Sequence, residues 1–309
     1  MKRPAVFWTL AFLLTIASAV VQRVTGPTYP VSGSTIMRGE RISFSFDRSH
    51  GGNANAVIRI QTRDGSIHGE VVWKRYKTTD EWQKAAMNNE NGNLSAELPH
   101  QPSGGKLEYQ VLLDDGVESI TLPEKDPVVM RFKGEVPSAI LIPHIIAMFG
   151  AMLLSTRAGL ECFAKNPSYK NLVTWTSVLQ VIGGFVLGPL VQLYAFNAWW
   201  TGWPFGGDLT DNKTAVALAA WIVSGIAIRR TTGQKKWVLG ASIITMVVFL
   251  IPHSLFGTEI DYNAEPQRHP ASSEIHQNEP EKAVFQKRAA REFSLYYRAV
   301  DGSSIASRS

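Results

Sequence analysis

The apolar segments of this chain constrain its fold more than any other feature. Five runs, at about residues 5–21, 138–156, 172–196, 214–229 and 237–256, approach or exceed the ~18 residues needed to cross a hydrocarbon layer about 30 Å thick. Ordinary polar sequence separates these runs, although the mean hydropathy of −0.04 conceals the division. The sequence therefore predicts a membrane protein that carries a soluble domain and a small bundle of five helices.

The N-terminal segment predicts export of the chain on its C-terminal side. Lys2 and Arg3 precede the first apolar run, and the triplet Ala17–Ala19 resembles a signal-peptidase site. The run continues past this triplet and is longer than the ~7–15 residues of a usual signal core. We therefore expect residues 1–23 to be retained as a signal anchor rather than cleaved, and either outcome places residue 24 onward outside the cytoplasm.

Residues 24–135 show a different periodicity. The stretches RISFSF, AVIRIQT and GEVVWKRY alternate apolar and polar residues, and turn clusters such as RSHGGNAN and NNENGN separate them. This pattern is typical of antiparallel strands, and about seven strands in ~105 residues is the size of a β-sandwich. We expect an extracytoplasmic β-sandwich followed by the helical bundle, which makes the fold class α + β.

One part of this region, Val71 to Gly116, resembles the immunoglobulin-like or fibronectin type III-like modules of bacterial envelope proteins. The features that carry the resemblance are Tyr76, Trp82, Met87, the strand Leu94–Pro99 and the segment QPSGGKLEYQVLLDDG. The resemblance implies a fold and a role in binding, spacing or subunit contacts, and it carries no catalytic residues. The chain as a whole resembles multi-pass membrane proteins of bacteria, a likeness that implies no function.

The positions of Lys and Arg predict the orientation of the helices. Basic residues gather in the second and fourth connecting loops, which should therefore be cytoplasmic; these residues are Arg157, Lys165, Lys170, Arg229, Arg230, Lys235 and Lys236. The loop between them has no Lys or Arg before Lys213 and should be external. We expect an inner (cytoplasmic) membrane protein with a cytoplasmic N-terminus, a bundle at residues 136–257, and an extracytoplasmic β-domain and polar tail (residues 258–309).

The external loop NAWWTGWPFGGDLTDN carries candidate interface residues. Trp199, Trp200 and Trp203 suit the membrane–water boundary, where an indole buries its ring and keeps its N–H in water. Asp208 and Asp211 follow a glycine-rich turn, and a carboxylate pair beside aromatic rings can bind cations or sugars. Helix capping and anchoring at the boundary are favoured over that binding role.

The tetrapeptide LIPH occurs twice, ending at His144 and at His253. Under the predicted topology, His144 lies roughly 10 Å and His253 roughly 5 Å below the same outer boundary, at a rise of about 1.5 Å per residue. An ionisable residue in a membrane segment is costly unless it faces the bundle or a polar cavity. Two histidines at similar depth are what a b-type haem needs; neutral imidazoles could equally hydrogen-bond a quinone carbonyl, or hold a metal ion with Met148.

Structural roles account for the same residues. A histidine near the headgroups can extend its ring to water, and a preceding proline often marks a helix end or kink. In the third apolar segment, Gly184 and Gly188 have the spacing that lets helices pack closely, Gln192 adds buried hydrogen-bonding capacity, and Pro189 should kink the helix. The repeat indicates no internal duplication, because the residues around its two copies differ.

Composition and motifs narrow the function classes. The formal net charge is +5, but the basic residues lie beside the ends of apolar segments, so topology explains them better than nucleic-acid binding does. The single cysteine, Cys162, excludes an intramolecular disulfide and any cysteine-based zinc or iron–sulfur cluster. The sequence contains no G-x-x-x-x-G-K, H-E-x-x-H, C-x-x-C-H or G-x-S-x-G motif.

Two functions remain. The first is a non-enzymatic integral membrane protein, without a cofactor, that displays an immunoglobulin-like domain for protein–protein interaction or assembly with other envelope membrane proteins. The alternative is a membrane electron-transfer protein that binds haem b or interacts with a quinone, with His144 and His253 as ligands and the β-domain as a docking platform. We favour the first because it requires only the domain architecture.

Overall fold

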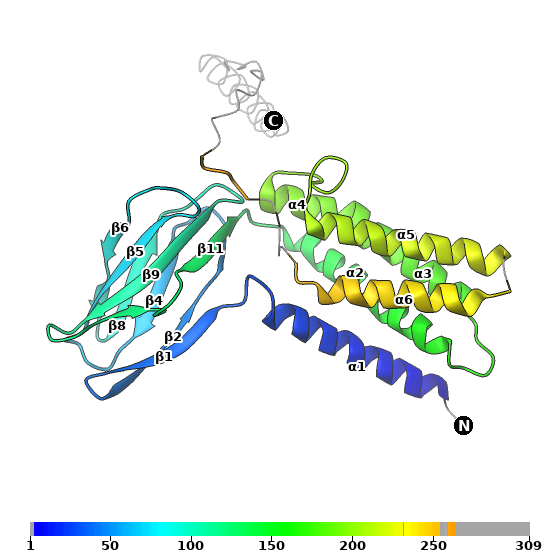
Figure 1. Cartoon of the computed structure of the whole chain (residues 1–309), viewed down its shortest axis with the longest axis horizontal. Coiled ribbons are helices and arrows are strands. Elements are labelled where there is room, and N and C mark those ends of the chain that lie inside the picture. The colour runs from blue at the N-terminus through cyan, green and yellow to red at the C-terminus, as the bar shows by residue number, and fades with distance from the viewer. Residues whose placement is uncertain (1–2, 231, 254–256, 258, 264–309) are drawn as a thin grey trace, which may run out of the picture. The chain divides into compact units, whose positions relative to one another are not determined.

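The computed structural model describes residues 3–230, 232–253, 257 and 259–263. Most of the predicted polar tail therefore lies outside the described residues. The helical elements are α1 (Arg3–Val24), α2 (Ser138–Glu161), α3 (Lys170–Gln180), the π-helix η1 (Val181–Leu187), α4 (Gly188–Phe196), α5 (Leu209–Arg230) and α6 (Gln234–Leu250) (Figure 1). The elements α3, η1 and α4 follow one another without a break, so they occupy the place of the third predicted apolar helix.

Eleven strands lie between α1 and α2 in the described part of the chain. They are β1 (Val31–Met37), β2 (Glu40–Phe46), β3 (Ser49–Gly51), β4 (Ala56–Gln61), β5 (His68–Arg75), β6 (Gln83–Ala86), β7 (Asn88–Glu90), β8 (Asn93–Leu98), β9 (Lys106–Asp114), β10 (Ser119–Leu122) and β11 (Val128–Lys133). They form a two-stranded sheet β1-β2, a three-stranded sheet β4-β8-β7 and a six-stranded sheet β3-β11-β9-β5-β6 in which β10 also pairs with β9. All pairings are antiparallel except that of β3 with β11.

The three sheets enclose one hydrophobic core. The period-two pattern of the sequence is seen directly in β4 and β9, where every second side chain is buried. Tyr109 of β9 is fully buried, and its hydroxyl donates a hydrogen bond of 2.9 Å to the carbonyl oxygen of Asp47. These sheets around a shared core are compatible with a β-sandwich, so the prediction of an α + β chain with a β-rich domain and several apolar helices is confirmed at that level.

A buried carboxylate closes one end of the β-domain. Asp115 accepts hydrogen bonds from the backbone N–H groups of Val117 and Glu118, at 2.8 and 2.7 Å, and from Nε of Arg38 at 2.7 Å. The two backbone donors, together with the Arg38 guanidinium, lower the pKa of Asp115 to about 2. Because Arg38 belongs to the β1–β2 turn, this contact ties that turn to the β9–β10 turn.

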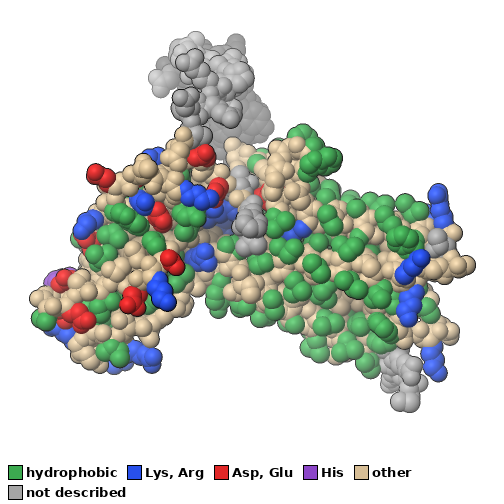
Figure 2. Space-filling view, viewed as in Figure 1, with side chains coloured by type: hydrophobic (Ala, Val, Ile, Leu, Met, Phe, Trp, Pro, Cys, Tyr) green, Lys and Arg blue, Asp and Glu red, His purple; other side chains and the backbone are tan. Residues whose placement is uncertain are grey.

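Among the residues that the structure describes, three helices are long and apolar enough to cross a membrane: Ala5–Val24, Ser138–Glu161 and the continuous stretch Lys170–Phe196. The fourth and fifth predicted spans are also helical, as α5 and α6, but α6 ends at Leu250 after only 17 residues. Figure 2 shows hydrophobic side chains over the visible face of the helical region, with Lys and Arg at its end. Such a wide apolar surface is what lipid would cover.

Side chains join the helices into one bundle. Helix α2 contacts α1, α3 and α6, and α5 contacts α3 and α6. The hydroxyl of Ser242 in α6 donates to the carbonyl oxygen of Ser155 in α2 at 2.9 Å, and the indole N–H of Trp221 in α5 donates to Thr245 of α6 at 2.7 Å. Hydrogen bonds of this kind hold helices together in lipid, where burying apolar surface gives no driving force.

The predicted cytoplasmic residues near α2 are packed more tightly than expected. Arg157 forms a 2.6 Å ion pair with Glu161 one helical turn later, and both side chains are buried. The Arg157 guanidinium also lies over the rings of Phe7 and Trp8 of α1, which makes it a link between two helices. Cys162, directly after the last residue of α2, is also buried.

We expect Asp115→Asn to lower the thermal unfolding midpoint of the β-domain at pH 7, measured by circular dichroism on the full-length chain in detergent. A carboxylate whose pKa is depressed in the folded state stabilises the fold above its unfolded pKa of about 4, and this stabilisation is lost as the pH falls towards 2. Between pH 5 and 2, the unfolding midpoint of the variant should therefore fall less than that of the wild-type chain. Asp114→Asn, whose amide oxygen can still accept from Gly116, is the control; an unchanged acid profile in Asp115→Asn would contradict the assignment.

Candidate functional site

A cavity of about 600 Å³ lies where the β-domain meets the helices. The β-domain contributes residues of β3, β11 and the segment after β11, and the helices contribute residues of α2, η1, α4 and the start of α5. His253, three residues beyond the end of α6, completes the lining. The volume is within the ~300–1,000 Å³ typical of small-molecule sites.

The cavity brings together most of the residues singled out from the sequence. His144, His253, Met148, Asp208 and Asp211 all line it. The tryptophans of the external loop, Trp199, Trp200 and Trp203, are not among its lining residues. The two LIPH copies thus meet at one site, although they are far apart in the chain.

The environment of His144 fixes the tautomer of its ring. Its Nδ1 lies 2.9 Å from the carbonyl oxygen of Gly183. A carbonyl oxygen can only accept, so Nδ1 carries the hydrogen of the neutral ring and Nε2 carries a lone pair. Histidines that ligate metals are commonly held in this way, by a hydrogen bond from the other ring nitrogen to a carbonyl.

The π-helix η1 supplies that carbonyl and brings the chain close to α2. The N–H of Gly188 donates to Gly183, five residues earlier, and Pro189 has no N–H with which to continue the α-helical pattern. A Cβ at Gly183 would lie 2.8 Å from the sulfur of Met148, and one at Gly184 would lie 2.6 Å from a methyl group of Thr214. A side chain at Gly183 or Gly184 would have to displace its neighbour, so close packing occurs at these two positions. The prediction named Gly184 and Gly188, and at Gly188 the nearest side-chain atom, in the His144 ring, would be at an ordinary contact distance of 3.9 Å.

His253 is positioned by the way α6 ends. The prediction placed it inside the helix, but α6 ends at Leu250, because Pro252 cannot continue the hydrogen-bond pattern and disfavours helical geometry at the residue before it. The carbonyl groups left over are bound by side chains of other helices. Gln22 of α1 donates to Phe249 at 2.7 Å, and the ammonium of Lys213 in α5 donates to Ile251 at 2.6 Å.

Lys213 was not recognised from the sequence as a structural residue. It is 5 % exposed, and its charge faces the carbonyl end of α6, where a cation is favoured by the helix dipole. In the sequence, Lys213 stands out only as the first basic residue before the predicted fourth span. Nothing in the local sequence shows that it reaches a carbonyl 38 residues away.

The two aspartates of the external loop have structural roles. Asp208 precedes α5, and its side chain accepts from the N–H of Thr210 at 2.7 Å, which is the geometry of an N-terminal cap. Asp211 accepts from the N–H groups of Thr201 and Gly202, at 2.7 and 3.0 Å, and the amide of Gln192 also donates to it. Asp208 thus caps α5, as the capping interpretation expected, whereas Asp211 lies within the first turn of α5 and binds the backbone of the preceding loop.

The tryptophans support the same loop from outside the cavity. Trp200 stacks on Phe185 of η1 with ring centroids 5.5 Å apart, and its indole N–H donates to the carbonyl of Trp203 at 3.2 Å. Trp199 and Trp203 are exposed. Their anchoring at a membrane boundary stays a prediction.

The β-domain side of the cavity contains a buried arginine that the sequence analysis missed. The guanidinium of Arg131 in β11 lies 4.0 Å from the ring centroid of Phe196, the last residue of α4. Directly after β11, the N–H of Gly134 donates to the carbonyl of Ala195 at 2.9 Å. In a strand pattern Arg131 looks like an ordinary outward-facing residue, because its partner is distant in sequence.

The chain beyond α6 returns to the β-domain. Tyr262 accepts from the N–H of Lys106 at 3.0 Å, and Glu259 pairs with Lys77 at 2.6 Å and with the ammonium of Lys106. The start of the predicted tail is therefore bound to the protein rather than solvated. These contacts hold residues 259–262 against the β-domain.

No family model, curated protein or solved structure matches this chain. Within the residues that the structure describes, no group of three or more His, Cys, Asp or Glu side chains could hold a metal ion. The site must therefore be interpreted from its own geometry.

We expect Asp211→Ala to release the loop formed by residues 197–208. Two backbone donors would lose their acceptor at a cost of about 1–3 kcal/mol, which raises the open population of the loop roughly tenfold. Limited proteolysis of the purified chain should cut this loop correspondingly faster. Asp211→Asn keeps one acceptor oxygen and should be intermediate; cleavage of Asp211→Ala at the wild-type rate would show that the carboxylate does not hold the loop.

Proposed function

We propose that this chain is a non-enzymatic integral membrane protein that displays an immunoglobulin-like or fibronectin type III-like β-domain outside the cytoplasm. In this proposal it resides in the inner membrane of a bacterium, and the cavity between β-domain and helices is its recognition site for a small ligand or for a side chain of an envelope partner protein. Helices α5 and α6 cross the bilayer together with the three longer ones.

The distribution of charge supports this orientation. Lys165 lies in the α2–α3 connection, and Lys170, Arg229, Lys235 and Lys236 lie in the helix turns next to the α2–α3 and α5–α6 connections. At the other end of the bundle, α4 meets the β-domain through the contacts of Gly134 and Arg131. Basic loops favour the cytoplasmic side, which leaves the β-domain and the cavity on the other side. The alternation of helix direction along the chain agrees with five crossings.

The observation that carries the proposal is the composition of the cavity wall. Polar groups from separate elements converge there, with His144 from α2, Thr214 from α5 and His253 from the segment after α6. Apolar side chains such as Leu141 and Val191 surround them. Charged side chains, among them Arg131 and Asp208, also belong to the lining, so the wall is mixed polar and apolar. A concave site of this size in which polar groups from several elements converge has the form of a ligand pocket.

The tautomer of His144 favours one second candidate, a haem-binding electron-transfer protein. With Nδ1–H bound to Gly183, the Nε2 lone pair is the form that ligates iron. The same tautomer cannot donate from Nε2 to a quinone carbonyl, so the geometry at His144 favours haem over a quinone. His144 and His253 would hold the haem iron, and the Arg131 guanidinium, which lines the same cavity, would supply positive charge for the haem carboxylates.

Filling the cavity tests the recognition site. Val191→Phe places a ring at the cavity wall, whereas Val186→Phe makes the same change at an exposed position that is not part of the lining. We expect native mass spectrometry of the wild-type chain, purified from its membranes, to show a bound small molecule or a partner that Val191→Phe loses and Val186→Phe keeps. Retention by both variants would reject the cavity as the recognition site.

The absorbance spectrum of the same preparations separates the two candidates. A Soret band that disappears in both His144→Ala and His253→Ala, and persists in His68→Ala on the exposed start of β5, would establish the haem protein. The non-enzymatic proposal predicts no such band after expression in a haem-competent host, with a bound species that does not absorb there.

A further inference from the structure

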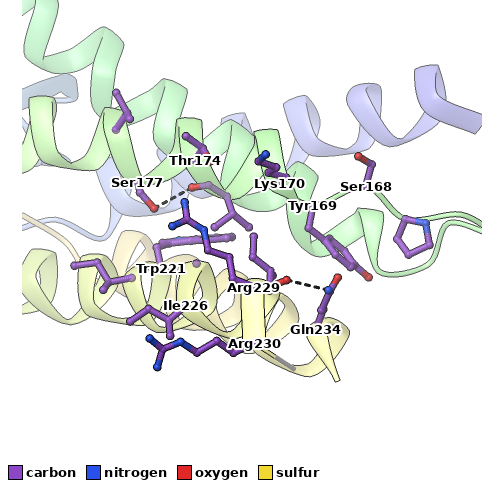
Figure 3. A pocket seen from close by; sticks show the side chains of 16 residues that line it. Ser168, Tyr169, Lys170, Thr174, Ser177, Trp221, Ile226, Arg229, Arg230 and Gln234 are labelled. Carbon is purple, nitrogen blue, oxygen red and sulfur yellow. Dashed lines mark hydrogen bonds between the residues drawn. The ribbon is translucent and has the colours of Figure 1, made fainter. Parts of the chain in front are cut away.

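A second cavity, of about 650 Å³, lies between α3 and α5 at the end of the bundle opposite the β-domain (Figure 3). It is separate from the first cavity, since the two share no lining residue. None of the motifs in the sequence pointed to it. The side chains that line it differ in character between its inner and outer parts.

The inner part of this groove is lined mainly by apolar side chains, together with the hydroxyl groups of Thr174 and Ser177. Trp221 lies fully buried beneath the groove, and Gly225 leaves a space beside Val173 because it has no side chain. A Cβ at Gly225 would lie 3.8 Å from a methyl group of Val173, so the two helices do not press on each other there. Ile222 and Ile226 form the wall on α5. This part of the groove suits a hydrocarbon chain.

The outer part of the groove is basic. Lys170, at the start of α3, and Arg229 and Arg230, at the end of α5, are exposed and line the cavity together with the polar side chains of Ser168 and Gln234. Figure 3 shows the side chains of Lys170 and Arg229 extending from the two facing helices. The lining includes no Asp or Glu. Three cations at the end of an apolar groove need an anionic partner.

We propose that this groove binds one anionic phospholipid of the cytoplasmic leaflet. An acyl chain lies along Ile222, Gly225 and Val178, and the phosphate lies at the mouth between Lys170 and Arg229. Lys170 is also the first residue of α3, so the positive end of that helix dipole lies beside the mouth. Basic pockets between helices at the cytoplasmic surface recognise anionic headgroups through the same combination of charge and depth.

The lipid site depends on the proposed placement of the helices in a membrane and not on the ligand of the first cavity. A free phosphate would use only the mouth, whereas a lipid must use both parts of the groove. Neutral phospholipids would gain the apolar contacts without the charge. An anionic lipid, a neutral lipid and a soluble phosphate ester are therefore the three probes, and the variants change either the mouth or the inner part of the groove.

The test measures binding of phosphatidylglycerol, phosphatidylcholine and glycerol-1-phosphate to the full-length chain in detergent micelles by native mass spectrometry. We expect phosphatidylglycerol to bind in preference to phosphatidylcholine. The double variant Lys170→Gln with Arg229→Gln should bind phosphatidylglycerol roughly 30-fold more weakly, at about 1 kcal/mol for each cation. Gly225→Leu, which fills the groove and favours the helix, should weaken binding of the lipid but leave the mouth intact.

The control is Lys235→Gln with Lys236→Gln, which removes the same charge at the same end of the bundle, on α6 and outside the groove. It should bind phosphatidylglycerol as the wild type does. Equal weakening by both double variants, equal binding of the two phospholipids, unchanged binding by Gly225→Leu, or displacement of the lipid by glycerol-1-phosphate would each overturn the proposal. The single variant Lys170→Gln, about fivefold weaker, serves if the double variant does not fold. If a groove variant loses phosphatidylglycerol but keeps the ligand of the first cavity, the lipid site is independent of the proposed recognition site.

Discussion

The hydrogen bonding of backbone groups in an apolar environment is the constraint on which this structure depends. Helices satisfy their own peptide groups, except at their ends and where the pattern is broken. Pro252 ends α6 and Pro189 follows the π-helix η1, so polar backbone groups appear at one end of the bundle. Gln22, Lys213 and His144 donate to them, and these donors bring the walls of the first cavity into place.

The two ends of the bundle differ in chemistry because they meet different surroundings. At one end, helix ends, the external loop and the β-domain exchange hydrogen bonds and enclose a mixed polar and apolar cavity. At the other, exposed cations surround the mouth of an apolar groove, while Arg157 and Glu161 are paired inside. The first arrangement suits recognition of a solute or partner, and the second suits contact with anionic lipid.

The sequence predicted the helices and strands that follow from local residue patterns. It did not predict the contacts between residues that are far apart in the chain. Apolar runs and period-two alternation identified the helices and the β-domain, because each pattern is set by neighbouring residues. The repeated LIPH pointed to two histidines that do line one cavity, but its second copy lies beyond α6 rather than within it. Arg131, Lys213 and the π-helix carbonyl of Gly183 were not predicted, since their partners come from distant helices.

In the proposed topology, the helices place the β-domain and the basic ends of the helices on opposite sides of a membrane. Labelling of whole cells with a membrane-impermeant maleimide tests this placement, using Cys162→Ser chains that carry either Val117→Cys in an exposed β-domain turn or Lys165→Cys in the α2–α3 connection. The Val117→Cys chain should be labelled in cells whose outer barrier is permeabilised, and the Lys165→Cys chain only after the inner membrane is opened. Labelling of the Lys165→Cys chain in intact cells, or protection of the Val117→Cys chain until lysis, would contradict it.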